Sequence, residues 1–86
     1  MHEGTIMKDL IRKIESVARE AGAERVTAVK VRLGALSEMS EAHFREHFEA
    51  SSLGTLAAGA SLAVHATADL DPEAQKIVLE SVEVAG

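Results

Sequence analysis

The chain has 86 residues, no cysteine and a formal net charge of −5 at pH 7. This length predicts a single domain over residues 1–86 with a small core, because such chains bury only about 60–65% of their unfolded surface. The lack of cysteine excludes disulfides, iron–sulfur clusters and thiol catalysis. Acidic charge and only two aromatic residues argue against a nucleic-acid partner, which would need phosphate contacts and base stacking.

Residues 5–22 are predicted to form the first helix. Apolar residues recur there at steps of three and four, and charged residues occupy the other face. Thr5 can cap the start of this helix, and Gly22 suits its C-terminal turn. The charged residues also interrupt any apolar run, so we expect no signal peptide, no membrane span and a cytoplasmic protein.

Residues 25–34 are predicted to form a strand, because apolar and basic residues alternate. Val29, Val31 and Leu33 would lie on one face. Lys30 and Arg32 would lie on the other and form a small basic stripe with Arg25. We interpret this stripe as a solvated face of a sheet; contact with an acidic partner is the alternative.

A second helix is predicted from Glu41 to about Leu53. Ser40 is its expected N-cap, and Glu41 suits the positive end of the helix dipole. Phe44 and Phe48, four residues apart, should point into the core.

Residues 61–68 and 76–84 are predicted to form the last two strands. The turn near 69–75 is acidic, contains the single proline, and has a length that suits a loose hairpin. The order helix-strand-helix-strand-strand therefore predicts an α+β fold with two helices packed on a small three-stranded mixed sheet.

Three of the four histidines lie in the predicted elements. His43 and His47 share a face of the second helix, so they are a candidate second metal site; a surface pair without a metal is the simpler interpretation. Residues 43–47 match the H-x-x-E-H pattern of some zinc peptidases, but a peptidase needs a third ligand, a cleft and a larger scaffold. We interpret His65 as a half-exposed sheet residue.

His2 follows the terminal amine directly. The Met1 amine, the His2 amide nitrogen and the His2 imidazole can close adjacent chelate rings, and the Glu3 amide can add a fourth nitrogen. Such a planar nitrogen set suits Ni(II) or Cu(II) better than tetrahedral Zn(II). From spacing alone, a disordered terminal histidine is the simpler interpretation.

The start Met1-His2-Glu3, followed at once by an amphipathic helix, resembles the HypA/HybF family of hydrogenase nickel-insertion proteins. Similar stretches cover nearly the whole chain. They are the sequences at 25–27, 31–37 (Val-Arg-Leu-Gly-Ala-Leu-Ser), 48, 54–57, 59–62 and the closing strand 77–84.

This resemblance implies an α+β nickel metallochaperone and not an enzyme. Met1, His2 and Glu3 would hold Ni(II) for a nickel enzyme such as [NiFe]-hydrogenase, with a HypB-like GTPase and the enzyme's large subunit as partners. Family members carry a zinc lobe with paired Cys-x-x-Cys motifs between the last two strands. Residues 66–75 replace that lobe here, so no structural zinc is expected.

The alternative is a HypA-like adaptor that has lost metal binding. Such a module would use its first helix or a sheet edge to bind a partner or to form a homo-oligomer, because exposed strand edges favour pairing.

Overall fold

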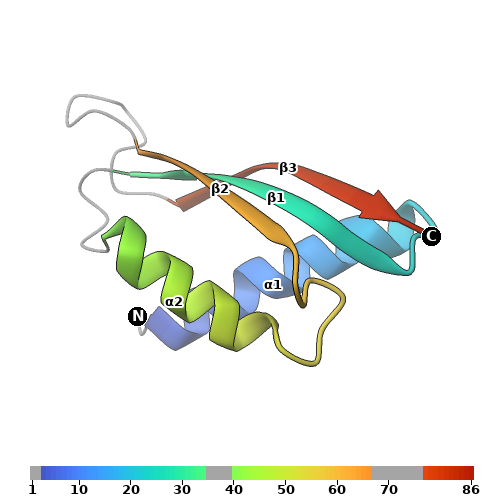
Figure 1. Ribbon diagram of the computed structural model, residues 1–86, viewed down its shortest axis with the longest axis horizontal. Coiled ribbons are helices and arrows are strands. Elements are labelled where there is room, and N and C mark those ends of the chain that lie inside the picture. Colours follow the sequence, from blue (N-terminus) through green and yellow to red (C-terminus); the bar gives the residue numbers. More distant parts are fainter. Residues whose placement is uncertain (1–2, 35–39, 67–76) are drawn as a thin grey trace.

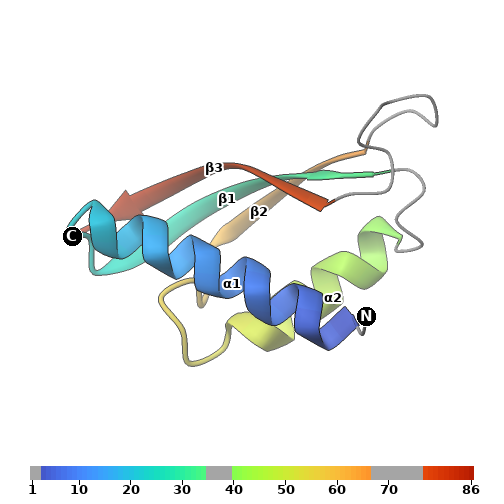
Figure 2. The same cartoon turned by 180° about the vertical axis from the view of Figure 1, so that it is seen from behind.

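The chain forms a small sheet with both helices on one face, in a computed structural model that describes residues 3–34, 40–66 and 77–86 (Figures 1 and 2). The predicted α+β fold and its element order are confirmed. The elements are α1 (Glu3–Glu20), β1 (Arg25–Leu33), α2 (Glu41–Ser52), β2 (Ser61–Ala66) and β3 (Ile77–Ala85). No helix of the described ranges is both long and apolar enough to cross a membrane.

The sheet has the order β2-β1-β3, with β1 at its centre. β1 pairs with β2 in parallel, through the crossover helix α2, and with β3 antiparallel. The predicted hairpin between the last two strands is therefore wrong, because β2 and β3 lie on opposite sides of β1. β1 and β3 are both nine residues long and pair over most of their length. β2 has only six residues, so it could pair with β3 over a shorter length.

A register irregularity near the start of β1 changes which of its side chains face the helices. Val26 and Val29 are both buried, although strict alternation would put them on opposite faces. The register with β3 shifts between Val26 and Ala28, so Thr27 is an extra residue in β1. A bulge of this kind resets the alternation and lets both valines join the core.

The core lies between the sheet and the helices. The predicted contributions of Phe44 and Phe48 are confirmed, since their exposed fractions are 0% and 3%. The core residues of α1 recur at helical spacing, which explains why this segment forms a helix against the sheet. The buried apolar residues are Met7, Leu10, Ile11, Ile14, Ala18, Val26, Val29, Val31, Leu33, Phe44, Phe48 and Ala57.

The helix ends agree with the prediction in three of four positions. Gly22 follows α1 with φ +71° and Gly54 follows α2 with φ +78°, a conformation that glycine adopts without strain. Ser40 caps α2, because its Oγ accepts a hydrogen bond from the His43 amide at 3.1 Å. Thr5 is not a cap: α1 already begins at Glu3, where an acidic residue suits the helix dipole.

Candidate metal sites

The N-terminal candidate site precedes and includes the first residue of α1. Glu3 begins that helix, whereas Met1 and His2 lie outside the described residues. One turn further, the Met7 side chain is fully buried, and Leu10 and Ile11 are buried in the following turn. These three buried residues anchor α1 in the core from its second turn onward.

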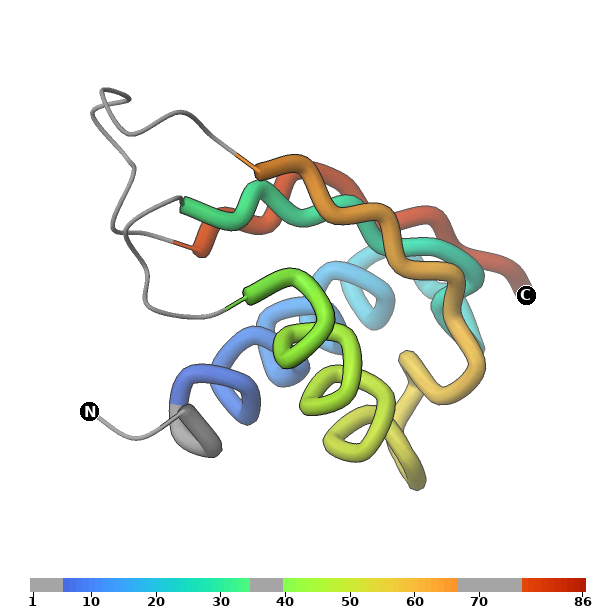
Figure 3. Tube along the Cα trace, turned by 60° about the vertical axis from the view of Figure 1, so that its left-hand side comes forward, coloured from blue at the N-terminus to red at the C-terminus, as the bar shows by residue number. Residues whose placement is uncertain are grey.

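The two helices bring their N-terminal ends to the same end of the molecule (Figures 1 and 3). Both helix dipoles therefore place partial positive charge at this end, which opposes a bound cation. Glu3 at the start of α1 and Glu41 in the first turn of α2 offset that effect with negative charge. The helix dipoles would lower the affinity of a cation site at this end, and the two glutamate charges would raise it.

The histidine pair lies in the first two turns of α2. The His43 and His47 rings are stacked, with centroids 4.6 Å apart and planes within 9° of parallel. Each histidine directly precedes a buried phenylalanine, Phe44 or Phe48. Because these two phenylalanines fix the rotation of α2 against the core, they also fix the face on which both imidazoles lie.

A hollow with a volume of ≈ 290 Å³ lies beside the two imidazoles. Glu46 and Ala50 line it together with His43 and His47. Among the residues with described positions, no group of three His, Cys, Asp or Glu side chains converges as a metal site. The protein therefore supplies two nitrogen donors here, and the structure gives no support to the zinc-peptidase interpretation. His65 is exposed on β2, opposite Arg32 of β1.

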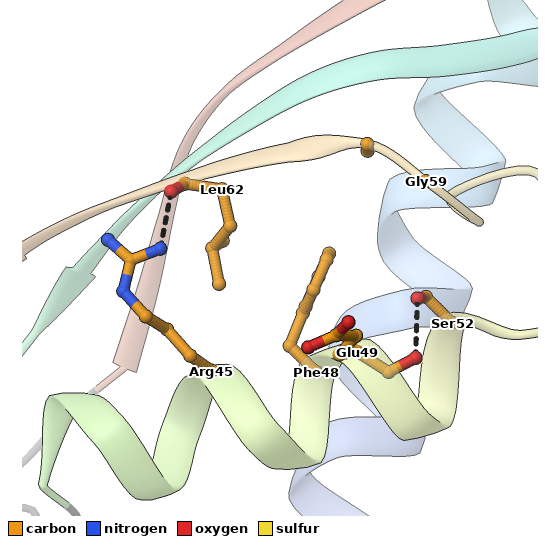
Figure 4. A pocket seen from close by; sticks show the side chains of 7 residues that line it. Arg45, Phe48, Glu49, Ser52, Gly59 and Leu62 are labelled. Carbon is orange, nitrogen blue, oxygen red and sulfur yellow. Dashed lines mark hydrogen bonds between the residues drawn. The ribbon is translucent and has the colours of Figure 1, made fainter.

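A second cavity, of ≈ 300 Å³, lies between α2 and the start of β2 (Figure 4). Arg45 at its rim donates hydrogen bonds to the Leu62 carbonyl at 2.8 Å and to the Glu41 carboxylate at 3.0 Å. Ser52 donates to the Glu49 carbonyl at 3.1 Å. Arg45 and Ser52 are both engaged in hydrogen bonds within the protein, so we assign the cavity a structural role in which Arg45 covers a carbonyl of edge strand β2.

Sequence reasoning overlooked Arg45. The available signal was the spacing of Glu41 and Arg45, an acid and a base four residues apart on one helix. That spacing predicts the ion pair between them, but not the contact of Arg45 with β2, because the contact depends on how α2 crosses the sheet.

The structure is a small α+β domain whose second helix carries two stacked imidazoles on one face. The chain belongs to the HypA family, since the model described as "Hydrogenase/urease nickel incorporation, metallochaperone, hypA" matches residues 1–70. This is a family of metallochaperones and maturation factors and not of enzymes. The predicted family membership is thereby confirmed.

Curated relatives share more than a third of the aligned residues. The chain is 36% identical over 64 residues to hydrogenase maturation factor HypA of Nitrosospira multiformis, an alignment covering 74% of the chain and 56% of the relative. It is 40% identical over 62 residues to HypA of Klebsiella pneumoniae, covering 72% and 54%. Identity to HybF of Salmonella typhimurium is 37% over 62 residues, covering 72% and 55%. The aligned part of the chain thus spans just over half the length of these relatives.

Solved structures match the fold over the whole chain. The solution structure of the Ni metallochaperone HypA from Helicobacter pylori has a TM-score of 0.80 at 21% identity, covering 99% of this chain and 98% of that one. A second HypA solution structure has a TM-score of 0.77 at 20% identity, covering 98% and 96%. At these identities the similarity establishes the fold alone.

Proposed function

We propose that this protein carries Ni(II) at its N-terminus and passes it to a nickel enzyme such as [NiFe]-hydrogenase. The Met1 amine and the His2 imidazole would be the principal ligands, with Glu3 next to them. The observation that supports this proposal is the family match, which begins at residue 1 and so includes the three proposed ligand residues. The adaptor without a metal is disfavoured for the same reason.

Chemistry favours nickel as the cargo of such a site. The amine, the imidazole and the intervening amide offer nitrogen donors that suit Ni(II) and Cu(II). The dipole of α1 opposes the cation and the Glu3 carboxylate attracts it, so a moderate affinity is expected. Moderate affinity suits a donor, because an acceptor protein can then take the metal by offering a more complete set of ligands.

The proposed partners are a HypB-like GTPase and the large subunit of the nickel enzyme. We propose that the protein meets them in the cytoplasm. The relatives are hydrogenase maturation factors, and a role of that kind requires contact with other maturation proteins. No structural zinc is part of the proposal, because the chain has no cysteine to form a thiolate site.

Calorimetric titration of Ni(II) tests the proposal. Protein with its native N-terminus should bind Ni(II), and His2→Ala should weaken that binding by at least about tenfold, because loss of even an outer-shell group costs this much. His65→Ala is the matched control: it removes an exposed histidine from β2 and should leave binding unchanged. Equal Ni(II) affinity of the native and His2→Ala proteins would contradict the proposal.

A further inference from the structure

The stacked histidine pair on α2 is the strongest feature that the N-terminal site does not use. We propose that His43 and His47 form a second metal site, for a late first-row divalent cation such as Ni(II), Cu(II) or Zn(II). The site is built from side chains of α2 alone, and it stands whether or not the N-terminus binds nickel.

The spacing of the two rings is already close to what a shared metal requires. With metal–nitrogen bonds of about 2.0–2.1 Å, each ring centre lies about 3.2 Å from the metal. Two rings at angles of about 90–109° would then have centres roughly 4.5–5.2 Å apart. The observed centroid separation of the His43 and His47 rings is 4.6 Å. The centroid separation therefore suits a shared metal, and metal binding requires the rings to turn out of their parallel stack so that one nitrogen of each faces the metal.

The backbone that carries the pair is held in place before any metal binds. Buried Phe44 and Phe48 anchor α2 to the core, and the Ser40 cap fixes the helical turn at His43. A rigid support lowers the entropy cost of bringing two ligands together. The backbone of the pair is thus preorganised, and only the two rings must turn, although the pair provides only two protein ligands.

The surroundings leave room for the rest of the coordination shell. The hollow beside the rings has a volume of ≈ 290 Å³, and Glu46 is among the residues that line it. Water can fill the positions that the protein leaves open, as it does at open zinc sites. Open positions also allow a ligand from another molecule to enter, so metal bound here would exchange readily.

Imidazole donors decide which metals the site takes. They suit Cu(II), Ni(II) and Zn(II), whereas Mg(II) and Ca(II) prefer oxygen ligands. We expect Cu(II) to bind more tightly than Ni(II), following the general order for divalent cations. His43 lies in the first turn of α2. Both helices begin at the same end of the molecule (Figure 3), so the two proposed metal sites would lie at that end.

The test uses the His2→Ala protein, which lacks the principal side chain of the N-terminal site. Zn(II) is added while NMR follows the ring protons of each histidine, and Ni(II) affinity is measured by calorimetry. The ring signals of His43 and His47 should shift together while those of His65 stay in place. Loss of either ligand, in His43→Ala or His47→Ala, should weaken binding by at least about tenfold.

A spacing control separates a chelate from ordinary surface histidines. The double substitution Ala42→His/His43→Ala keeps the number of histidines but places them five residues apart, on different faces of α2. It should weaken binding as much as His43→Ala does, and Mg(II) should not shift the ring signals of any variant. Circular dichroism verifies that each variant folds, and His43→Gln replaces His43→Ala if the latter does not.

Two results would overturn this inference. The first is unchanged metal affinity in the spacing variant, which would mean that the two imidazoles do not act together. The second is no Zn(II) or Ni(II) binding by the His2→Ala protein. Such a result would leave the N-terminal proposal intact, because that proposal depends on metal bound by the protein that retains His2.

Discussion

Phe44 is the most deeply buried side chain of α2. Its exposed fraction is 0%, and its ring lies 6.4 Å from that of Phe48, centroid to centroid. Replacing a buried phenylalanine by alanine costs about 3–5 kcal/mol, through lost burial and the cavity left behind. A chain of 86 residues is expected to have a total stability of about 4–13 kcal/mol. Phe44→Ala should therefore remove a large share of the stability, or all of it.

Urea unfolding followed by circular dichroism measures this loss. Phe44→Leu keeps most of the volume and should cost less than about 1.5 kcal/mol, which gives a folded variant if the alanine protein does not fold. Leu53→Ala is the control, because Leu53 is a large apolar residue with 72% of its surface exposed, and its loss should change stability by less than about 0.5 kcal/mol. A cost below about 1 kcal/mol for Phe44→Ala would refute the packing described here.

Two local predictions concern the ends of the helices. Ser40→Ala removes the acceptor of the His43 amide and should cost about 1 kcal/mol in urea unfolding, while Ser40→Asp should keep most of the stability; equal losses in both would argue against a capping role. Gly22→Ala should cost roughly 1 kcal/mol, because Gly22 has φ +71° while nothing within 4 Å obstructs an added Cβ. An unchanged midpoint for Gly22→Ala would show that the turn does not need this conformation.

The sequence predicted the helices and strands well, because each of them depends on a pattern of residues close together in the chain. The period of the apolar residues identified α1, the serine before Glu41 identified the start of α2, and the two phenylalanines identified its buried face. The sequence predicts the start of α1 two residues late, because Thr5 is a typical N-cap residue but the acidic Glu3 also suits the start of a helix.

Strand pairing was less predictable, because it depends on residues far apart in the sequence. A short turn between β2 and β3 favoured a hairpin, whereas β3 pairs with β1 on the other side. The extra residue Thr27 could not be predicted from the sequence either. The buried Val26 breaks the alternation of Val29, Val31 and Leu33, and the register of β1 with β3 shows the reason.

For the candidate metal sites, the sequence predicted the candidate ligand residues, and the structure added the distance between the two imidazoles of α2. Four-residue spacing predicts that His43 and His47 share one face of α2, and the structure adds their ring separation of 4.6 Å and the adjoining hollow. Met1 and His2 lie outside the described residues, so the N-terminal ligand set remains a prediction from the sequence and the family.

The central claim is that the free Met1 amine is a nickel ligand. The most direct test compares the Ni(II) affinity of the native chain with that of a chain bearing a Gly-Ser-Gly-Ser extension, both carrying His43→Ala/His47→Ala. The extension keeps every side chain but separates the terminal amine from His2, and mass spectrometry verifies both N-termini. We predict that the extension weakens Ni(II) binding by at least about tenfold. Equal affinity of the two chains would contradict the claim.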